Sequence, residues 1–165
     1  MSTFMPAVVN LWKTIESYDI DPAPLFEAEN LKLQLPPDPC RRVPYEKIDR
    51  IRSKAIEVCG DEAFGIRSAM CYVPSQSGAL GYALLASTSV RSACLLMERY
   101  IRVLNINSDV SVEDRGSCIV VTPTVRTPSK NEVIRDDTSL AIITRICQIT
   151  YGEKFRLEAV NFTRA

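Results

Sequence analysis

The segment from Gly78 to Tyr100 constrains the fold of this chain most strongly, because it predicts two helices broken by a polar turn. The first helix, over residues 79–86, is short and almost wholly apolar. Residues 87–89 read Ser-Thr-Ser and offer hydroxyl caps for the free N–H groups of the next helix. In that helix, over residues 90–104, apolar side chains recur at the spacing of one helical face, which predicts a buried stripe. The stripe consists of Val90, Cys94, Met97, Ile101 and Leu104. The segment therefore predicts a helical hairpin within a hydrophobic core.

Length and composition fit one globular domain. The chain has 165 residues, of which 46% are hydrophobic and 24% charged, which is typical of a folded soluble protein. A core of this size does not need disulfides or metals to fold. The 20 basic and 20 acidic residues give a net charge of +0. Because neutralisation of phosphates dominates the affinity of DNA-binding domains, this balance disfavours direct DNA binding by the chain.

The sequence predicts neither a targeting segment nor a membrane span. The first ten residues lack the basic region and long apolar run of a signal peptide. No segment approaches the ~18 consecutive apolar residues that a membrane helix needs. The expected location is the cytoplasm.

Six cysteines are widely spaced, and histidine is absent. No C-x-x-C pair occurs, so the usual zinc and haem ligation patterns are missing, and no metal or cofactor is expected. Cys94 and Cys147 fall on apolar helix faces and are interpreted as small core residues. The cysteines as a group are expected to be reduced structural thiols. A redox sensor using an exposed thiol such as Cys40 or Cys71 is the alternative.

Helices outnumber strands in the remaining sequence. Further helices are expected over residues 6–18, 24–29, 45–59, 62–70 and 131–151. Four prolines within residues 35–44 predict a loop, and residues 73–78 are also expected to be a loop. Residues 110–122 predict an antiparallel hairpin around a turn at residues 114–116, with its β-branched second strand buried. Residues 154–162 are expected to be extended. The predicted class is α+β, with about six helices packed with a small antiparallel β-sheet.

The residues that common enzymes use are missing. Without histidine the commonest general base is absent, and the sequence contains no G-x-S-x-G, Walker or G-x-G-x-x-G motif. The acidic pairs Asp61-Glu62 and Asp136-Asp137 are interpreted as helix-start residues that the macrodipole favours. Basic residues cluster on one face of the helix over residues 45–59, and this face is expected to be solvated, with a contact surface for a partner domain or nucleic acid as the alternative. The chain is therefore not expected to be an enzyme, and no catalytic residue is predicted.

The order of residues in the 78–100 segment carries a family resemblance. Gly78-Ala-Leu-Gly-Tyr-Ala-Leu-Leu-Ala-Ser-Thr-Ser89 resembles the "G-x-L-G-Y-A-L-L-x-S-x-T" segment of the N-terminal domain of AraC-type (arabinose-regulator) transcription factors. Asp61-Glu-Ala-Phe-Gly-Ile-Arg67 resembles the "D-P-x-F/L-G-L" element of the same domain. The resemblance covers nearly the whole chain and is weaker over residues 105–153. One departure is Glu29-Asn30, which stands where the family has a glycine. Asparagine tolerates the left-handed conformation that such a position requires.

The resemblance implies a regulatory function. It implies a bacterial, cytoplasmic domain that binds a small-molecule effector, forms a homodimer, and meets DNA only through a separate C-terminal domain with helix-turn-helix units. Residues 1–165 are expected to be a truncated single N-terminal regulatory domain, with the helix-turn-helix domain absent from this chain. The alternative is a ligand-free interaction or oligomerisation module.

The resemblance gives no ligand motif at the level of residues, so only residue type and expected placement predict the ligand contacts. Effector pockets are apolar clefts with a few polar groups. The candidates are Arg67, Tyr72, Tyr82, Met97, Tyr100 and Arg115. Further apolar walls are expected from Leu80, Leu85 and Ile119.

Overall fold

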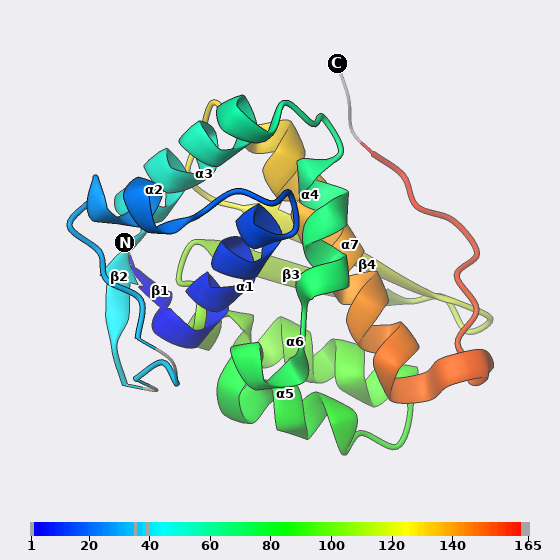
Figure 1. Ribbon diagram of the computed structural model, residues 1–165. Coiled ribbons are helices and arrows are strands. Elements are labelled where there is room, and N and C mark those ends of the chain that lie inside the picture. The colour runs from blue at the N-terminus through cyan, green and yellow to red at the C-terminus, as the bar shows by residue number, and fades with distance from the viewer. Residues whose placement is uncertain (1, 35, 39, 163–165) are drawn as a thin grey trace.

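Helices surround two small sheets (Figure 1). The computed structural model describes residues 2–34, 36–38 and 40–162. Positions 35 and 39 of the predicted loop, and positions 1 and 163–165 of the predicted domain, lie outside the described residues. The described residues form seven α-helices and two two-stranded antiparallel sheets, which confirms the α+β class and adds a second sheet to the one expected. The α-helices are α1 (Met5–Glu16), α2 (Ala23–Glu27), α3 (Tyr45–Cys59), α4 (Phe64–Arg67), α5 (Gly78–Leu85), α6 (Val90–Leu104) and α7 (Glu132–Tyr151). The strands are β1 (Ser2–Phe4), β2 (Arg42–Pro44), β3 (Ser108–Asp114) and β4 (Ile119–Val125), and the 3-10 helices are η1 (Ser68–Cys71), η2 (Pro74–Ser77) and η3 (Gly152–Lys154).

The expected helical hairpin is present as α5 and α6. The Ser89 hydroxyl caps α6 by accepting a hydrogen bond from the Ser92 N–H at 3.2 Å. On α6 the predicted stripe faces inward at Cys94 and Met97, each 1% exposed, while the rest of the stripe is half-buried. The helix α5 is less buried than expected, since Leu80, Gly81 and Leu84 face the core whereas Tyr82 and Leu85 are exposed. An apolar composition alone does not bury a helix that packs on one side.

Two helix ends follow from backbone conformations that few residues adopt. Gly60 ends α3 with a φ of +62°, in the left-handed region that favours glycine, as the sequence predicts. Asn30 has a φ of +53°, so the asparagine does adopt the left-handed conformation where the family has glycine. Basic side chains of α3 form ion pairs with acidic residues. For example, the Arg50 Nη2 lies 2.7 Å from the Glu29 Oε2.

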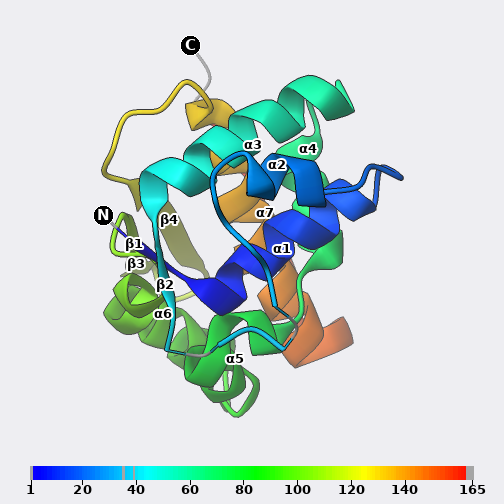
Figure 2. The same cartoon turned by 60° about the vertical axis from the view of Figure 1, so that its left-hand side comes forward.

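The molecule has two hydrophobic clusters rather than one core. The first gathers apolar side chains of α1, α2, α3 and α4, with Ile15, Phe26 and Ile51 among the most buried. The second joins α5, α6, the β3–β4 hairpin and α7, around Leu84 and Met97. In Figures 1 and 2, α3 lies at one end of the molecule and the α5–α6 pair at the other, with α1 and α7 between them.

The hairpin has the expected strands and antiparallel pairing, with a register that runs from Ser108 opposite Val125 to Asp114 opposite Ile119. The expected burial of its second strand is wrong. The residues of β4 are half-buried or exposed, because α7 packs against β4 while every second side chain points away.

The prediction that residues 35–44 form only a loop is also wrong. Arg42–Pro44 forms β2 and pairs antiparallel with β1, with Thr3 opposite Val43. Proline is tolerated in such a strand because β2 lies at a sheet edge and needs no N–H on its free side.

Three other segments differ from expectation. The helix expected over residues 62–70 is divided into α4 and η1, and the expected loop at 73–78 contains η2. Residues 155–162 pair with no strand among the described residues, and in Figure 1 they run outward as an irregular arm. An isolated segment has no ladder of hydrogen bonds to hold it as a strand.

Candidate functional site

A cavity of about 210 Å³ lies between the two hydrophobic clusters. Val8, Leu11 and Phe64 of the first cluster line it, and Leu80, Leu84 and Met97 of the second cluster also line it. The cavity therefore separates the α1–α3 half of the molecule from the α5–α6 half. Largely apolar clefts and cavities with a few polar groups are where proteins bind small molecules.

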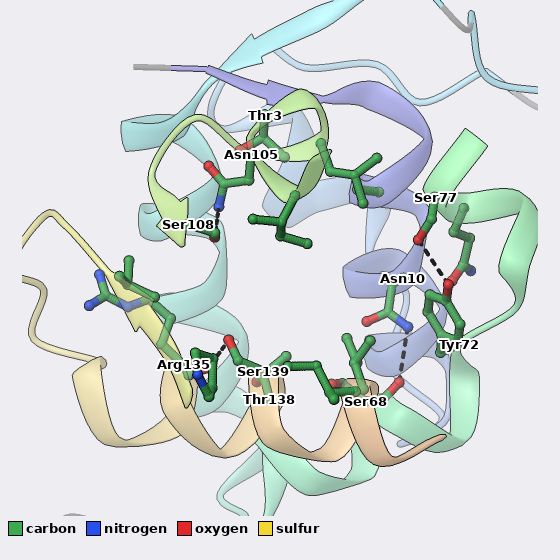
Figure 3. A pocket seen from close by; sticks show the side chains of 18 of the residues that line it. Thr3, Asn10, Ser68, Tyr72, Ser77, Asn105, Ser108, Arg135, Thr138 and Ser139 are labelled. Atoms are coloured by element: carbon green, nitrogen blue, oxygen red, sulfur yellow. Dashed lines mark hydrogen bonds between the residues drawn. The ribbon is translucent and has the colours of Figure 1, made fainter. Parts of the chain in front are cut away.

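One wall of the cavity carries polar groups that bond to one another (Figure 3). The Asn10 amide donates to the backbone oxygen of Ser68 at 2.9 Å. The hydroxyls of Tyr72 and Ser77 lie 2.8 Å apart, within the buried part of the wall. Burial raises the pKa of the Tyr72 hydroxyl above its usual range, which reinforces the protonated state that a tyrosine has at neutral pH.

The opposite part of the lining comes from α7, with Arg135, Thr138 and Ser139 side by side in Figure 3. Arg135 is only 4% exposed. Its Nη1 donates to the Tyr45 hydroxyl at 3.0 Å and to the Thr127 backbone oxygen at 2.7 Å. Its Nε is buried and has no hydrogen-bond partner among the described residues.

A third group of polar side chains comes from the chain start and the β3 region. Thr3, Asn105 and Ser108 line the cavity across from α7 (Figure 3). The Asn105 amide donates to the Ser108 hydroxyl at 2.9 Å. The Thr3 hydroxyl is buried and, within the described part of the chain, has no hydrogen-bond partner. Unsatisfied buried polar atoms are uncommon in native proteins, so each marks a place where a bound molecule or water would find a partner.

Asp109 also lines the cavity, and two arginines engage its carboxylate. Its two carboxylate oxygens accept hydrogen bonds from Arg102 and Arg126, each at 2.5 Å. These hydrogen bonds hold the pKa of the Asp109 carboxyl below its usual range.

The structure brings two of the six candidate residues to this cavity. Tyr72 and Met97 line it, together with Leu80 from the expected apolar walls. Met97 contributes because the α6 stripe faces the second cluster.

The other four candidates lie elsewhere. The guanidinium carbon of Arg67 lies over the Tyr18 ring, 4.2 Å from the ring centroid. Tyr82 is 61% exposed on α5. Tyr100 is exposed on α6, and Arg115 pairs with Glu113 at 2.9 Å near the hairpin turn. Ligand contact by any of the six stays a prediction.

Most of the polar residues that line the cavity were not predicted from the sequence. Asn10 and Thr14 lie on the buried face of α1, four residues apart, where their polarity was a usable signal. Arg135 gave a weaker signal, because α7 is apolar on several sides and its charged residues do not form one face.

The described residues contain no group of three or more His, Cys, Asp or Glu side chains arranged to hold a metal ion. They also contain no helix that is both long and apolar enough to cross a membrane.

Residues 20–165 match the family described as the arabinose-binding domain of AraC transcription regulators, N-terminal. A comparison with curated proteins found no match for the chain. The matched family is a regulatory ligand-binding domain and not an enzyme family. The match spans most of the chain and agrees with the resemblance carried by the 61–67 and 78–89 segments. This chain belongs to the family of N-terminal arabinose-binding domains of AraC transcription regulators.

Proposed function

We propose that this domain senses a small molecule in the cavity between its two clusters and thereby controls DNA binding by a separate domain of the regulator. The observation that carries the proposal is the position of the cavity, because residues of both clusters line it. A ligand there touches both halves of the fold at once.

Effector control requires a ligand that binds two states of the protein with different affinity. A molecule in this cavity would contact α1 through Leu11, α5 through Leu84 and α7 through Ile143. Any difference in how these helices pack changes the contacts available to the ligand. Ligand binding would therefore favour one arrangement of the helices over another.

A cavity-filling substitution tests the proposal. Thermal unfolding of the wild-type domain is measured against a panel of amino acids, short fatty acids and sugars, since a ligand of the folded state raises the unfolding temperature. Ile143→Trp fills the cavity from α7, and we expect it to abolish any shift found with the wild type. Ile149→Trp is the matched control, because Ile149 lies on the same helix and is 37% exposed. Equal ligand shifts in the wild type and Ile143→Trp would contradict the proposal.

Self-association is the second part of the proposal, and exposed apolar residues of α6 support it. Leu95 and Val103 are 49% and 59% exposed and lie two turns apart on one face of the helix. Exposed apolar patches on soluble proteins mark interaction sites. We expect this face to pack against a second copy of the chain.

Light scattering after size exclusion tests self-association. We expect the wild type to run as a dimer and the double variant Leu95→Glu, Val103→Glu to run as a monomer. Val133→Glu is the control, because Val133 is 50% exposed at the start of α7. A wild type that stays monomeric at high concentration would rule out the dimer.

A further inference from the structure

We infer that the cavity takes a small amphipathic carboxylate, held at its charged end by Arg135, rather than a polyhydroxylated sugar. The inference rests on the proposed function, because it names the chemical class of the molecule that the cavity would sense. Four observations carry it: the state of Arg135, its surroundings, the hydroxyls of the lining, and the cavity size.

Arg135 is a buried cation whose hydrogen bonds to Tyr45 and Thr127 end on neutral acceptors. The hydrogen bonds found for it end on the Tyr45 hydroxyl and the Thr127 backbone oxygen, both uncharged acceptors. Its Nε lacks a hydrogen-bond partner among the described residues. A buried charged donor without a partner costs free energy, and a carboxylate would remove that cost through a charge-assisted bond. The arginine fork also matches the planar, two-oxygen shape of a carboxylate.

Two nearby acidic groups, Asp49 and Asp136, do not replace such a ligand. The Asp49 Oδ2 accepts a hydrogen bond from the Ser129 hydroxyl at 2.8 Å, and its Oδ1 lies 3.5 Å from the Arg52 Nη1. The Asp49 carboxylate is therefore already paired with other groups. Asp136 follows Arg135 on α7, and burial raises the pKa of its carboxyl even though the charge of Arg135 opposes that shift. Asp136 is thus not a strongly stabilised ion-pair partner of Arg135.

The hydroxyl groups of the lining are poorly prepared for a sugar. Thr14 and Ser68 donate to the backbone oxygens of Asn10 and Gly65, each at 2.8 Å. On α7, Thr138 and Ser139 donate to backbone oxygens one turn earlier, at 2.7 and 3.0 Å. Each of these hydroxyls has only one proton to donate. A sugar has a hydroxyl on almost every carbon, and these four lining hydroxyls could only accept from it, because each already donates its proton. The Thr3 hydroxyl lacks a partner among the described residues. An apolar ligand body needs no such partners.

The remaining lining and the size of the cavity fit an apolar body. Val8, Leu84, Met97 and Ile143 supply carbon surface. An apolar cavity of about 150 Å³ is known to hold benzene. By that measure, the cavity of about 210 Å³ suits a ligand on the order of ten non-hydrogen atoms.

Matched acids and amides test the inference. Isothermal titration calorimetry compares octanoate with octanamide, and phenylacetate with phenylacetamide, with L-arabinose as the sugar probe. We expect the dissociation constant of each acid to be at least about tenfold lower than that of its amide, the effect of one charge-assisted hydrogen bond. Arg135→Gln should remove this preference and Arg135→Lys should keep part of it. Arg156→Gln is the control, because Arg156 is exposed in the C-terminal arm and should leave the preference unchanged.

A spectroscopic readout on the wild type covers the case in which Arg135→Gln does not fold. In an arginine Nε–H spectrum, we expect the signal of the buried Arg135 to shift with the acids and not with the amides. Equal affinity for acids and amides, or tighter binding of L-arabinose, overturns the inference and leaves the proposed function standing. Binding of none of the five probes also overturns the inference. The proposed function fails separately, if the wider compound panel gives shifts that Ile143→Trp does not abolish.

Discussion

Replacing Gly81 by alanine tests the close approach of α5 to η2, which forms part of the cavity wall. Gly81 lies on the buried face of α5. A Cβ atom added there would lie 1.9 Å from the Pro74 backbone oxygen and 2.7 Å from the Pro74 carbonyl carbon. Because backbone atoms cannot rotate away as a side chain does, α5 and η2 must separate to admit the methyl group.

Two opposing terms decide the size of the effect. Overpacking a closely packed site costs about 1–3 kcal/mol, and the contact with backbone atoms places Gly81→Ala near the upper end. Replacing glycine by alanine within a helix stabilises the folded state by about 1 kcal/mol, because alanine has the higher helix propensity. We therefore expect the free energy of unfolding to fall by about 2 kcal/mol. For a domain of this length that corresponds to a decrease of roughly 4–8 °C in the unfolding temperature.

Urea unfolding measures this difference directly, since a change in midpoint at constant slope reports stability. Ala83→Gly is the matched control on the exposed side of α5, and it should lower stability only by the propensity difference of about 1 kcal/mol. If Gly81→Ala is as stable as the wild type or more stable, helix propensity outweighs packing and the close approach is not as described.

Three further substitutions have defined outcomes. Asp109→Asn removes a carboxylate whose pKa Arg102 and Arg126 lower, so the wild type should be the more stable protein at neutral pH. Because the folded-state pKa is lowered, the Asp109 carboxylate stabilises the fold at pH values above the unfolded pKa of about 3.9. The stability difference between the wild type and Asp109→Asn should therefore vanish as the pH falls well below that value. A difference that stays constant in urea unfolding at several pH values would contradict this. Ser89→Ala should lower stability by about 1 kcal/mol in urea unfolding through loss of the α6 cap, and no loss would refute the cap. Phe64→Ala should cost about 3–5 kcal/mol in the same assay, because Phe64 is 2% exposed, and a loss below about 1 kcal/mol would show that its site is not tightly packed.

Elements with strong local signals were predictable from the sequence. The bounds predicted for α3, residues 45–59, agree with the structure, because its apolar positions keep helical spacing and Gly60 supplies the left-handed stop. The range predicted for α6, residues 90–104, also agrees, since Ser89 caps it and its apolar stripe continues to Leu104.

The small N-terminal sheet was not predictable in the same way. The strands β1 and β2 have three residues each and pair across a long stretch of chain that is rich in proline. Neither strand is long enough to show an alternating pattern. Their pairing is a tertiary contact that local sequence does not encode.

The cavity could be predicted only in part. Residue type and expected placement predict Tyr72 and Met97 as candidate contacts, and both line the cavity. The polar residues Thr3 and Arg135 lie far apart in sequence, and only the tertiary fold brings β1 and α7 to the same cavity. A space between two clusters leaves no pattern in any single helix.

Methyl NMR of isoleucine side chains tests most directly whether the cavity is the effector site. Five isoleucines line the cavity: Ile48, Ile101, Ile142, Ile143 and Ile146. Three others are exposed, at Ile66, Ile106 and Ile149. When the wild-type domain is titrated with a compound that raises its unfolding temperature, the account predicts that the methyl signals of the cavity group shift and those of the exposed group do not. Shifts confined to the exposed group would contradict it.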